Sequence, residues 1–350
     1  KRRCTFSQPC VREEVPRTMP NFQFIPDTDH ATRTNQAMHD GLYDSLRYLV
    51  DVLKDADPAL SVEFETWRQA IVPDQRLSSA EFGAYYDTVE AVQAGDPEMA
   101  ATLLRRIFSA RPLDMGVKVT VLGRDYSDAD TRRIEKFMGA PETGVAGVST
   151  PDPAQADRFA RKLDQAIAWI KHNLPDLHGE MNALLSELIL VGPVEGSREF
   201  EGGTCFRLWG AVALNAERKA SVADLIVTLA HEEGHAALFG ACKNEMLVEN
   251  PDSELYWSPI RGTERPLEGI FHASFVSARM IWVLRHMLAS KEFGWLERRR
   301  LSRILKDAEA IQRDSADIVR REGRLTETGR AVLQAMTDFM NGPFNSLNPV

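Results

Sequence analysis

The chain has 350 residues and a formal net charge of −9, with 43% hydrophobic and 27% charged residues. This length allows one large domain or two modest ones, and the composition is that of an ordinary globular protein. The negative charge argues against a protein that binds nucleic acid regardless of sequence, since that function needs a basic surface. Four cysteines without CxxC spacing exclude a disulfide scaffold and a zinc knuckle.

Neither end of the chain nor its most apolar region predicts a membrane protein. Residues 1–3 are basic but are not followed by an apolar segment, so a signal peptide is not expected. The most apolar stretch, 275–288, is interrupted by Arg279, Arg285 and His286. We therefore expect a cytoplasmic protein with free thiols and no membrane partner. Its oligomeric state cannot be inferred from these features.

The first part of the chain reads as an extended arm followed by helices. Residues 1–30 are rich in proline, arginine and polar residues. Apolar residues at three-to-four spacing then predict a helical region over residues 31–150. Within it we expect helices at about 62–71, 79–94 and 97–110, a strand at 117–122, and a linker or long loop at 139–153.

Residues 151–350 are predicted to form a metal-binding catalytic domain. We expect, in order, a helix at 154–170, strands at 188–191 and 205–214, a helix at 221–239, a helix at 265–289, and two or three helices within 293–340. Ser221 and Asp224 predict a capped start for the helix at 221–239, and Gly240 can close it. The predicted fold is mainly α (α+β), with a small sheet packed against the helix at 221–239.

The helix at 221–239 carries the HExxH motif, His231-Glu232-Glu233-Gly234-His235. Histidines four residues apart lie on one face of a helix, so both imidazoles can reach one metal ion. Glu232 can contact a metal-bound water or hold a ligand in place. This pattern predicts a metal site on this helix.

The helix at 265–289 offers two candidates for the third protein ligand, Glu268 and His272. They are four residues apart and share a face, which Arg265 and Arg279 extend in both directions. A buried Arg–Glu ion pair beside an incidental histidine would explain the same pattern without a metal.

The identity of the third ligand separates two chemistries. With Glu268, the site is that of a zinc metallopeptidase in which Glu232 acts as the base. With His272, three neutral imidazoles leave positions open on a six-coordinate Fe(II), where 2-oxoglutarate and dioxygen can bind. The far carboxylate of 2-oxoglutarate then needs an arginine, for which the sequence offers Arg261, Arg265 and Arg279.

Two blocks resemble a known bacterial family. The sequences YWSPIR at 256–261 and RPLEGIFH at 265–272 resemble the SPxR…RPLxGxxHG block of HExxH-motif peptide-modification proteins, which occur beside ribosomally made peptide natural products. The resemblance covers about residues 185 to 290. Two positions depart from the usual pattern: Glu233-Gly234 replaces a small apolar pair, and Ala273 stands where glycine is usual.

The resemblance implies a 2-oxoglutarate-dependent, non-haem iron hydroxylase that modifies the β-carbon of a residue in a precursor peptide. It implies Fe(II) at His231, His235 and His272, with an arginine on the co-substrate carboxylate. The zinc metallopeptidase is the alternative, and a peptide-binding scaffold without turnover is a third hypothesis. If the strand at 205–214 lies at a sheet edge, it can pair with an extended peptide.

Overall fold

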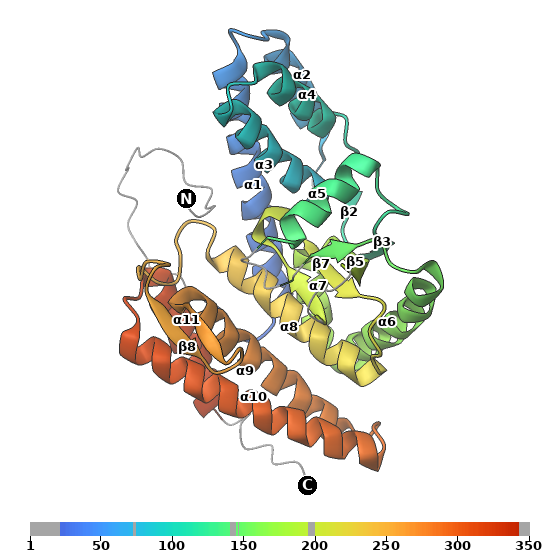
Figure 1. Ribbon diagram of the computed structural model, residues 1–350, viewed down its shortest axis with the longest axis vertical. Helices are drawn as coiled ribbons and strands as arrows, with labels where there is room; N and C mark the ends of the chain where they lie inside the picture. The colour runs from blue at the N-terminus through green and yellow to red at the C-terminus, as the bar shows by residue number, and fades with distance from the viewer. Residues whose placement is uncertain (1–21, 73–74, 141–144, 146, 195–199, 343–350) are drawn as a thin grey trace. The chain divides into compact units, whose positions relative to one another are not determined.

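The computed structural model describes residues 22–72, 75–140, 145, 147–194 and 200–342 (Figure 1). In these ranges helices dominate and the strands are short, which confirms the mainly α (α+β) fold class. The chain forms two compact units, each built from separate segments. Of the described residues, unit 1 contains those within 22–30, 165–179 and 220–342, and unit 2 contains those within 31–164 and 180–219. The division into consecutive segments 1–30, 31–150 and 151–350 that the sequence suggests stays a prediction.

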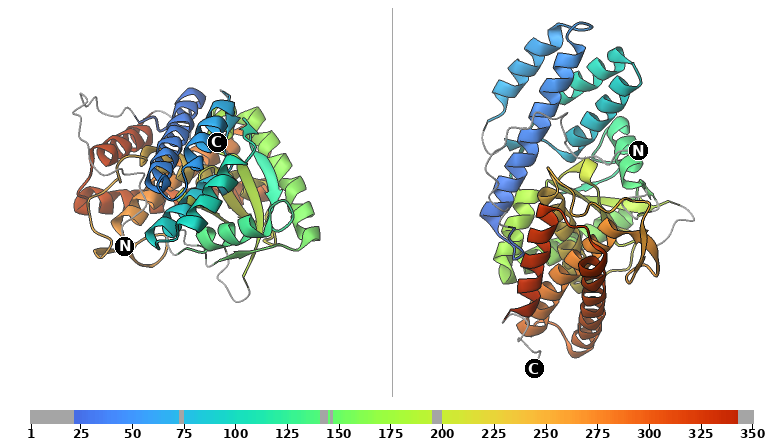
Figure 2. Two further views of the ribbon diagram at one scale, coloured as in Figure 1. Left: turned by 90° about the horizontal axis from the view of Figure 1, so that it is seen from above. Right: turned by 90° about the vertical axis from the view of Figure 1, so that its left-hand side faces the viewer.

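The helices of unit 2 form a bundle (Figure 2). Aromatic side chains pack between these helices. Trp67 lies with its ring centroid 5.8 Å from that of Tyr43 and 5.2 Å from that of Phe108, which joins three helices. The expected helices at 62–71, 79–94 and 97–110 are confirmed to within a few residues. The helices are α1 (Thr28–Leu53, of which all but the first three residues belong here), α2 (Ala59–Ala70), α3 (Ser79–Gln93), α4 (Pro97–Phe108) and α5 (Asp128–Met138).

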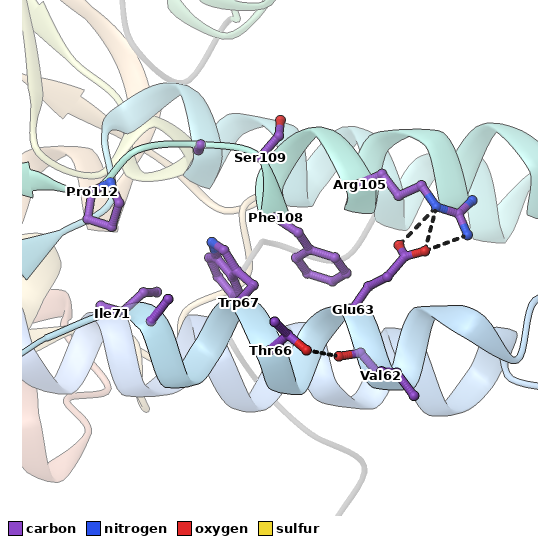
Figure 3. A pocket seen from close by; sticks show the side chains of 11 residues that line it. Val62, Glu63, Thr66, Trp67, Ile71, Arg105, Phe108, Ser109 and Pro112 are labelled. Carbon is purple, nitrogen blue, oxygen red and sulfur yellow. Dashed lines mark hydrogen bonds and ion pairs between the residues drawn. The ribbon is translucent and has the colours of Figure 1, made fainter.

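A pocket of about 640 Å³ opens between α2 and α4 (Figure 3). Trp67 and Phe108 form its apolar wall, and the carboxylate of Glu63 accepts hydrogen bonds from Arg105 Nε and Nη2 at one end. None of the residues that the motif analysis selects lines this pocket.

The main sheet of unit 2 has the strand order β3-β5-β7-β6. The first three of these strands are parallel, β6 is antiparallel to β7, and β4 pairs antiparallel with β5. The strands are β3 (Lys118–Val121), β4 (Val148–Ser149), β5 (Glu187–Pro193), β6 (Gly202–Thr204) and β7 (Ala211–Asn215); β1 (Gln75–Arg76) and β2 (Leu113–Asp114) form a separate antiparallel pair. Strand β4 lies inside the stretch predicted as a linker.

The prediction of one strand over 205–214 is wrong in its first half. Residues Phe206–Leu208 form a 3-10 turn, and Gly210 has a φ of 86°, which an L side chain rarely adopts. The backbone therefore turns before β7 begins. Strand β7 is fully buried and pairs on one side with β5 and on the other with β6. The expected edge for an added peptide strand is thus occupied within the chain.

The helices of unit 1 are centred on α9. It packs against both α8 and α10, which lie on either side of it in Figure 1, and it contacts α11 and the hairpin β8–β9. The two histidines of HExxH lie on α8, and His272 lies on α9. The elements are α8 (Val222–Ala241), β8 (Leu255–Ser258), β9 (Thr263–Pro266), α9 (Leu267–Ser290), α10 (Trp295–Glu322) and α11 (Glu327–Asn341); α6 (Pro153–Asn173) and α7 (Pro175–Leu184) contribute to both units.

Three details of unit 1 differ from the sequence analysis. Arg265 belongs to strand β9, because α9 begins only after Pro266, so it does not extend the helical face of Glu268. Gly240 lies inside α8, which ends at Cys242 with right-handed backbone angles. In the arm, Phe24 packs on Phe339 with ring centroids 4.5 Å apart, while residues 1–21 lie outside the described residues.

Helix α9 is also the helix, among those described, that is long and apolar enough to cross a membrane, although 83% of its most apolar window is buried. A buried core helix meets the same criterion. The sheet belongs to unit 2 and α8 to unit 1, so the expected packing of the sheet against α8 stays a prediction.

Candidate functional site

Helix α8 begins at a capping box, as the sequence predicts. The Ser221 hydroxyl accepts a hydrogen bond from the backbone of Asp224, whose carboxylate accepts one from the backbone of Ser221. Arg300 of α10 donates to the same carboxylate and ties α10 to this end of α8. Burial by itself would raise the pKa of Asp224, but the hydrogen bonds from Arg300 and Ser221 hold it below its ordinary value. The start of the helix that carries the motif is therefore fixed.

Helices α8 and α9 approach each other at Gly234. A Cβ atom placed there would lie 3.4 Å from side-chain atoms of both Arg279 and Val276. The backbone of α8 at Gly234 therefore lies close to the side chains of α9. This approach brings the His272 ring to that of His235, with the two Nδ1 atoms 3.2 Å apart. The structure thus brings together histidines that are 37 positions apart in the chain.

Two ring spacings among the three histidines are close to those of a shared metal ion. Imidazole nitrogens bound to one ion at about 2.1 Å hold their ring centroids about 4.6 to 5.3 Å apart. The centroids of His231 and His235 are 4.9 Å apart, and those of His235 and His272 are 5.4 Å apart. The donor types suit a metal, and these two spacings lie at or just above that range.

Of the three histidines, only His235 and His272 direct ring nitrogens toward each other. His231 directs Nδ1 toward Met280 Sδ, at 3.3 Å. As the side chains stand, the described residues contain no group of three His, Cys, Asp or Glu side chains that could hold a metal ion. A third donor therefore requires the His231 ring to turn.

The environment of the HExxH histidines favours their neutral form. Burial, followed by the charge of Arg261, lowers the pKa of His231 to about 4. Burial also lowers the pKa of His235 well below its usual range, with further contributions from His231, His272 and Arg261. Neutral imidazoles are the form that binds metal.

Glu268 is a further potential ligand near His272, and Cys242 lies close enough to Glu268 to feel its charge. Residue Glu268 is 7% exposed, and its carboxylate oxygen Oε1 lies 3.8 Å from His272 Nε2. Burial first, and then the charges of Glu268 and Glu245, hold the pKa of the Cys242 thiol well above its usual range. In the metal-free protein the Cys242 thiol therefore stays protonated.

The three arginines selected from the sequence occupy different environments. Arg261 lies exposed in the turn of the hairpin β8–β9, close enough to lower the pKa of both HExxH histidines. Arg265 lies half-buried on β9, opposite Tyr256. Arg279 is 1% exposed, and its Nη1 lies 3.6 Å from Glu233 Oε2. Of the three arginines, Arg261 is the one that is exposed and also lowers the pKa of the HExxH histidines.

The remaining members of the motif are buried. Glu232, the expected catalytic carboxylate, is 4% exposed, and Glu233 is fully buried. The Arg279 guanidinium that faces Glu233 is covered by Phe24 and Phe275, with its carbon 5.3 and 5.6 Å from the ring centroids. Glu233 and Arg279 are therefore part of the core of unit 1.

Sequence reasoning missed two residues that line the histidines. Phe239 lies with its ring centroid 6.2 Å from that of His235 and 5.4 Å from that of His272. Met280 contacts His231. Both were detectable, because Phe239 follows His235 by one helical turn and Met280 follows His272 by two.

Comparison with known proteins adds no assignment. No protein-family model matches this sequence, and no curated protein matches it either.

Proposed function

We propose that the protein is an Fe(II)- and 2-oxoglutarate-dependent hydroxylase that modifies the β-carbon of a residue in a ribosomally synthesised peptide. The observation that carries this proposal is the approach of His272 to the HExxH helix, with His235 Nδ1 and His272 Nδ1 3.2 Å apart. A third imidazole in this position matches a site of three neutral nitrogen donors, which leaves coordination positions for a co-substrate.

In this proposal His231, His235 and His272 hold the iron. When bound, Fe(II) with 2-oxoglutarate and dioxygen supplies the oxidising chemistry that hydroxylates an unactivated C–H bond and yields succinate and carbon dioxide. Arg261 binds the far carboxylate of 2-oxoglutarate, because it is exposed and near the histidines. Phe239 and Met280 keep water away from the rings that they contact.

A zinc metallopeptidase with Glu232 as base and Glu268 as third ligand is the second candidate. The observation in its favour is the buried Glu268 carboxylate, 3.8 Å from the ring of His272. It requires a glutamate where the hydroxylase requires a histidine, so single substitutions distinguish the two.

The test combines turnover with metal retention. Purified protein given Fe(II), ascorbate and 2-oxoglutarate in air is expected to release succinate slowly by itself and faster with a pool of synthetic peptides, some of which gain one oxygen. His272→Ala is expected to lose far more bound metal than Glu268→Ala. Zinc-dependent cleavage of the peptides without 2-oxoglutarate, together with the opposite order of metal loss, would establish the peptidase instead.

A further inference from the structure

The two ring nitrogens of His272 face different partners. Its Nδ1 lies 3.2 Å from His235 Nδ1, on the side where the HExxH rings converge. Its Nε2 is the ring nitrogen near Glu268, at 3.8 Å from Oε1. The carboxylate is therefore placed at the far side of the ring from the His235 nitrogen.

The Glu268 carboxylate needs a hydrogen-bond donor. Both of its oxygens are buried, and within the described ranges neither accepts a hydrogen bond. A buried carboxylate without donors is costly, because it loses its hydration without gaining a hydrogen bond. The ring of His272 is one helical turn away on the same face of α9, so a small rotation of either side chain brings Nε2 within hydrogen-bond distance.

A neutral imidazole carries one proton, and its position decides whether the ring can bind a metal at Nδ1. A proton on Nε2 can be donated to Glu268 and leaves the Nδ1 lone pair directed at His235. In the metal-free protein His235 Nδ1–H can then donate to this lone pair across 3.2 Å, and a metal cation can replace that proton. Metal-bound histidines commonly donate their second nitrogen to a carboxylate in this way.

We propose that Glu268 is a positioning residue: it accepts a hydrogen bond from His272 Nε2–H and so holds the ring with its Nδ1 lone pair toward His235. Glu268 is then not a metal ligand. The inference rests on the proposed function only in taking His272 as a ligand, and it makes no statement about the reaction catalysed.

The tautomer of His272 in the metal-free protein tests the proposal directly. Nitrogen-15 histidine labelling with two-bond 15N–1H correlation at pH 8 identifies which ring nitrogen carries the proton, and His272→Ala assigns the signal. The wild-type ring is expected to carry its proton on Nε2. Glu268→Gln, which keeps an acceptor oxygen, is expected to preserve this state, whereas Glu268→Leu is expected to give a mixture. A proton on Nδ1 in the wild type, or an unchanged tautomer in Glu268→Leu, would overturn the proposal.

Cobalt(II) titration distinguishes a positioning residue from a ligand. Glu268→Leu is expected to weaken Co(II) binding about 10- to 100-fold while the visible spectrum of the saturated protein stays that of the wild type. Glu268→Gln is expected to weaken binding less, and Glu264→Gln, an exposed residue of β9, serves as the matched control. A changed spectrum in both Glu268 variants would mean that the carboxylate binds the metal. Correct tautomer and spectra without succinate release would refute the hydroxylase and leave the role of Glu268 standing.

Discussion

Glu233 and Arg279 show how a single residue pair links the site to the core of unit 1. Both side chains are almost fully buried, at 0% and 2% exposure, and they join α8 to α9 beside Gly234. A buried Arg–Glu pair on the helix at 265–289 is one explanation of its polar face that the sequence offers. The pair exists, but its acid is Glu233 of α8, because charge spacing along one helix does not reveal a partner on another.

Removal of one member of this pair is expected to destabilise the protein. Glu233→Gln leaves the Arg279 charge in the core without its carboxylate, so we expect a loss of about 3 to 5 kcal/mol in the free energy of unfolding. Urea denaturation followed by circular dichroism measures it. Replacing Glu233 and Arg279 together by leucine and methionine is expected to cost less than either single change. Equal costs for the single and double variants would contradict a coupled pair.

The types of the site residues were predictable, but their orientations were not. The spacing of His231 and His235 predicts that they share a helical face, and both lie on α8 with ring centroids 4.9 Å apart. The ring nitrogen that each histidine presents depends on side-chain rotation and on neighbours such as Met280 and Glu268. No pattern in the sequence specifies that rotation.

At the scale of elements, helices were predicted best where caps and apolar spacing agree. Ser221 and Asp224 form the expected capping box, and α8 begins at the residue that follows Ser221. Strand limits were harder to predict, because the break before β7 depends on the positive φ of Gly210. A Cβ atom at Gly210 would also lie 2.7 Å from Ser186 Oγ, a contact that only the folded chain creates.

The capping box makes a testable contribution to stability that depends on pH. The pKa of Asp224 is lowered in the folded protein, so its contribution is complete above its ordinary pKa of 3.8 and is lost as the pH falls through the lower folded value. We expect Asp224→Asn to cost about 1 to 2 kcal/mol at pH 7 and progressively less below pH ~4.

Urea denaturation of both proteins at pH 7 and pH 3 measures this difference. Asp314→Asn is the control, since that side chain is 53% exposed and its neighbour Arg313 is at the surface. A cost that is the same at both pH values would show that the charge of Asp224 is not what stabilises the start of α8.

At the scale of the whole molecule, the candidate site lies entirely within unit 1, and the pocket between α2 and α4 lies within unit 2. Metal binding to the native state is therefore expected to protect unit 1 selectively. At a free metal concentration of about 100 times Kd the native state gains about 2.7 kcal/mol, which slows hydrogen exchange through local opening by about 100-fold.

Hydrogen–deuterium exchange with mass spectrometry, with and without Co(II), measures this protection. Peptides from α8 and α9 are expected to slow, while peptides from α4 are expected to keep their rates. His272→Ala is expected to remove the effect. Equal slowing in α4 would place the stabilising event outside the histidine cluster.

The division of the chain also sets an order of events during translation. Unit 2 is complete at residue 219, before any residue of α8 has been made, whereas unit 1 includes α11, which ends at Asn341. All of unit 2 therefore emerges from the ribosome before the HExxH histidines do. His272 emerges later still, so the nitrogen donors can come together only after unit 2 has had time to begin folding.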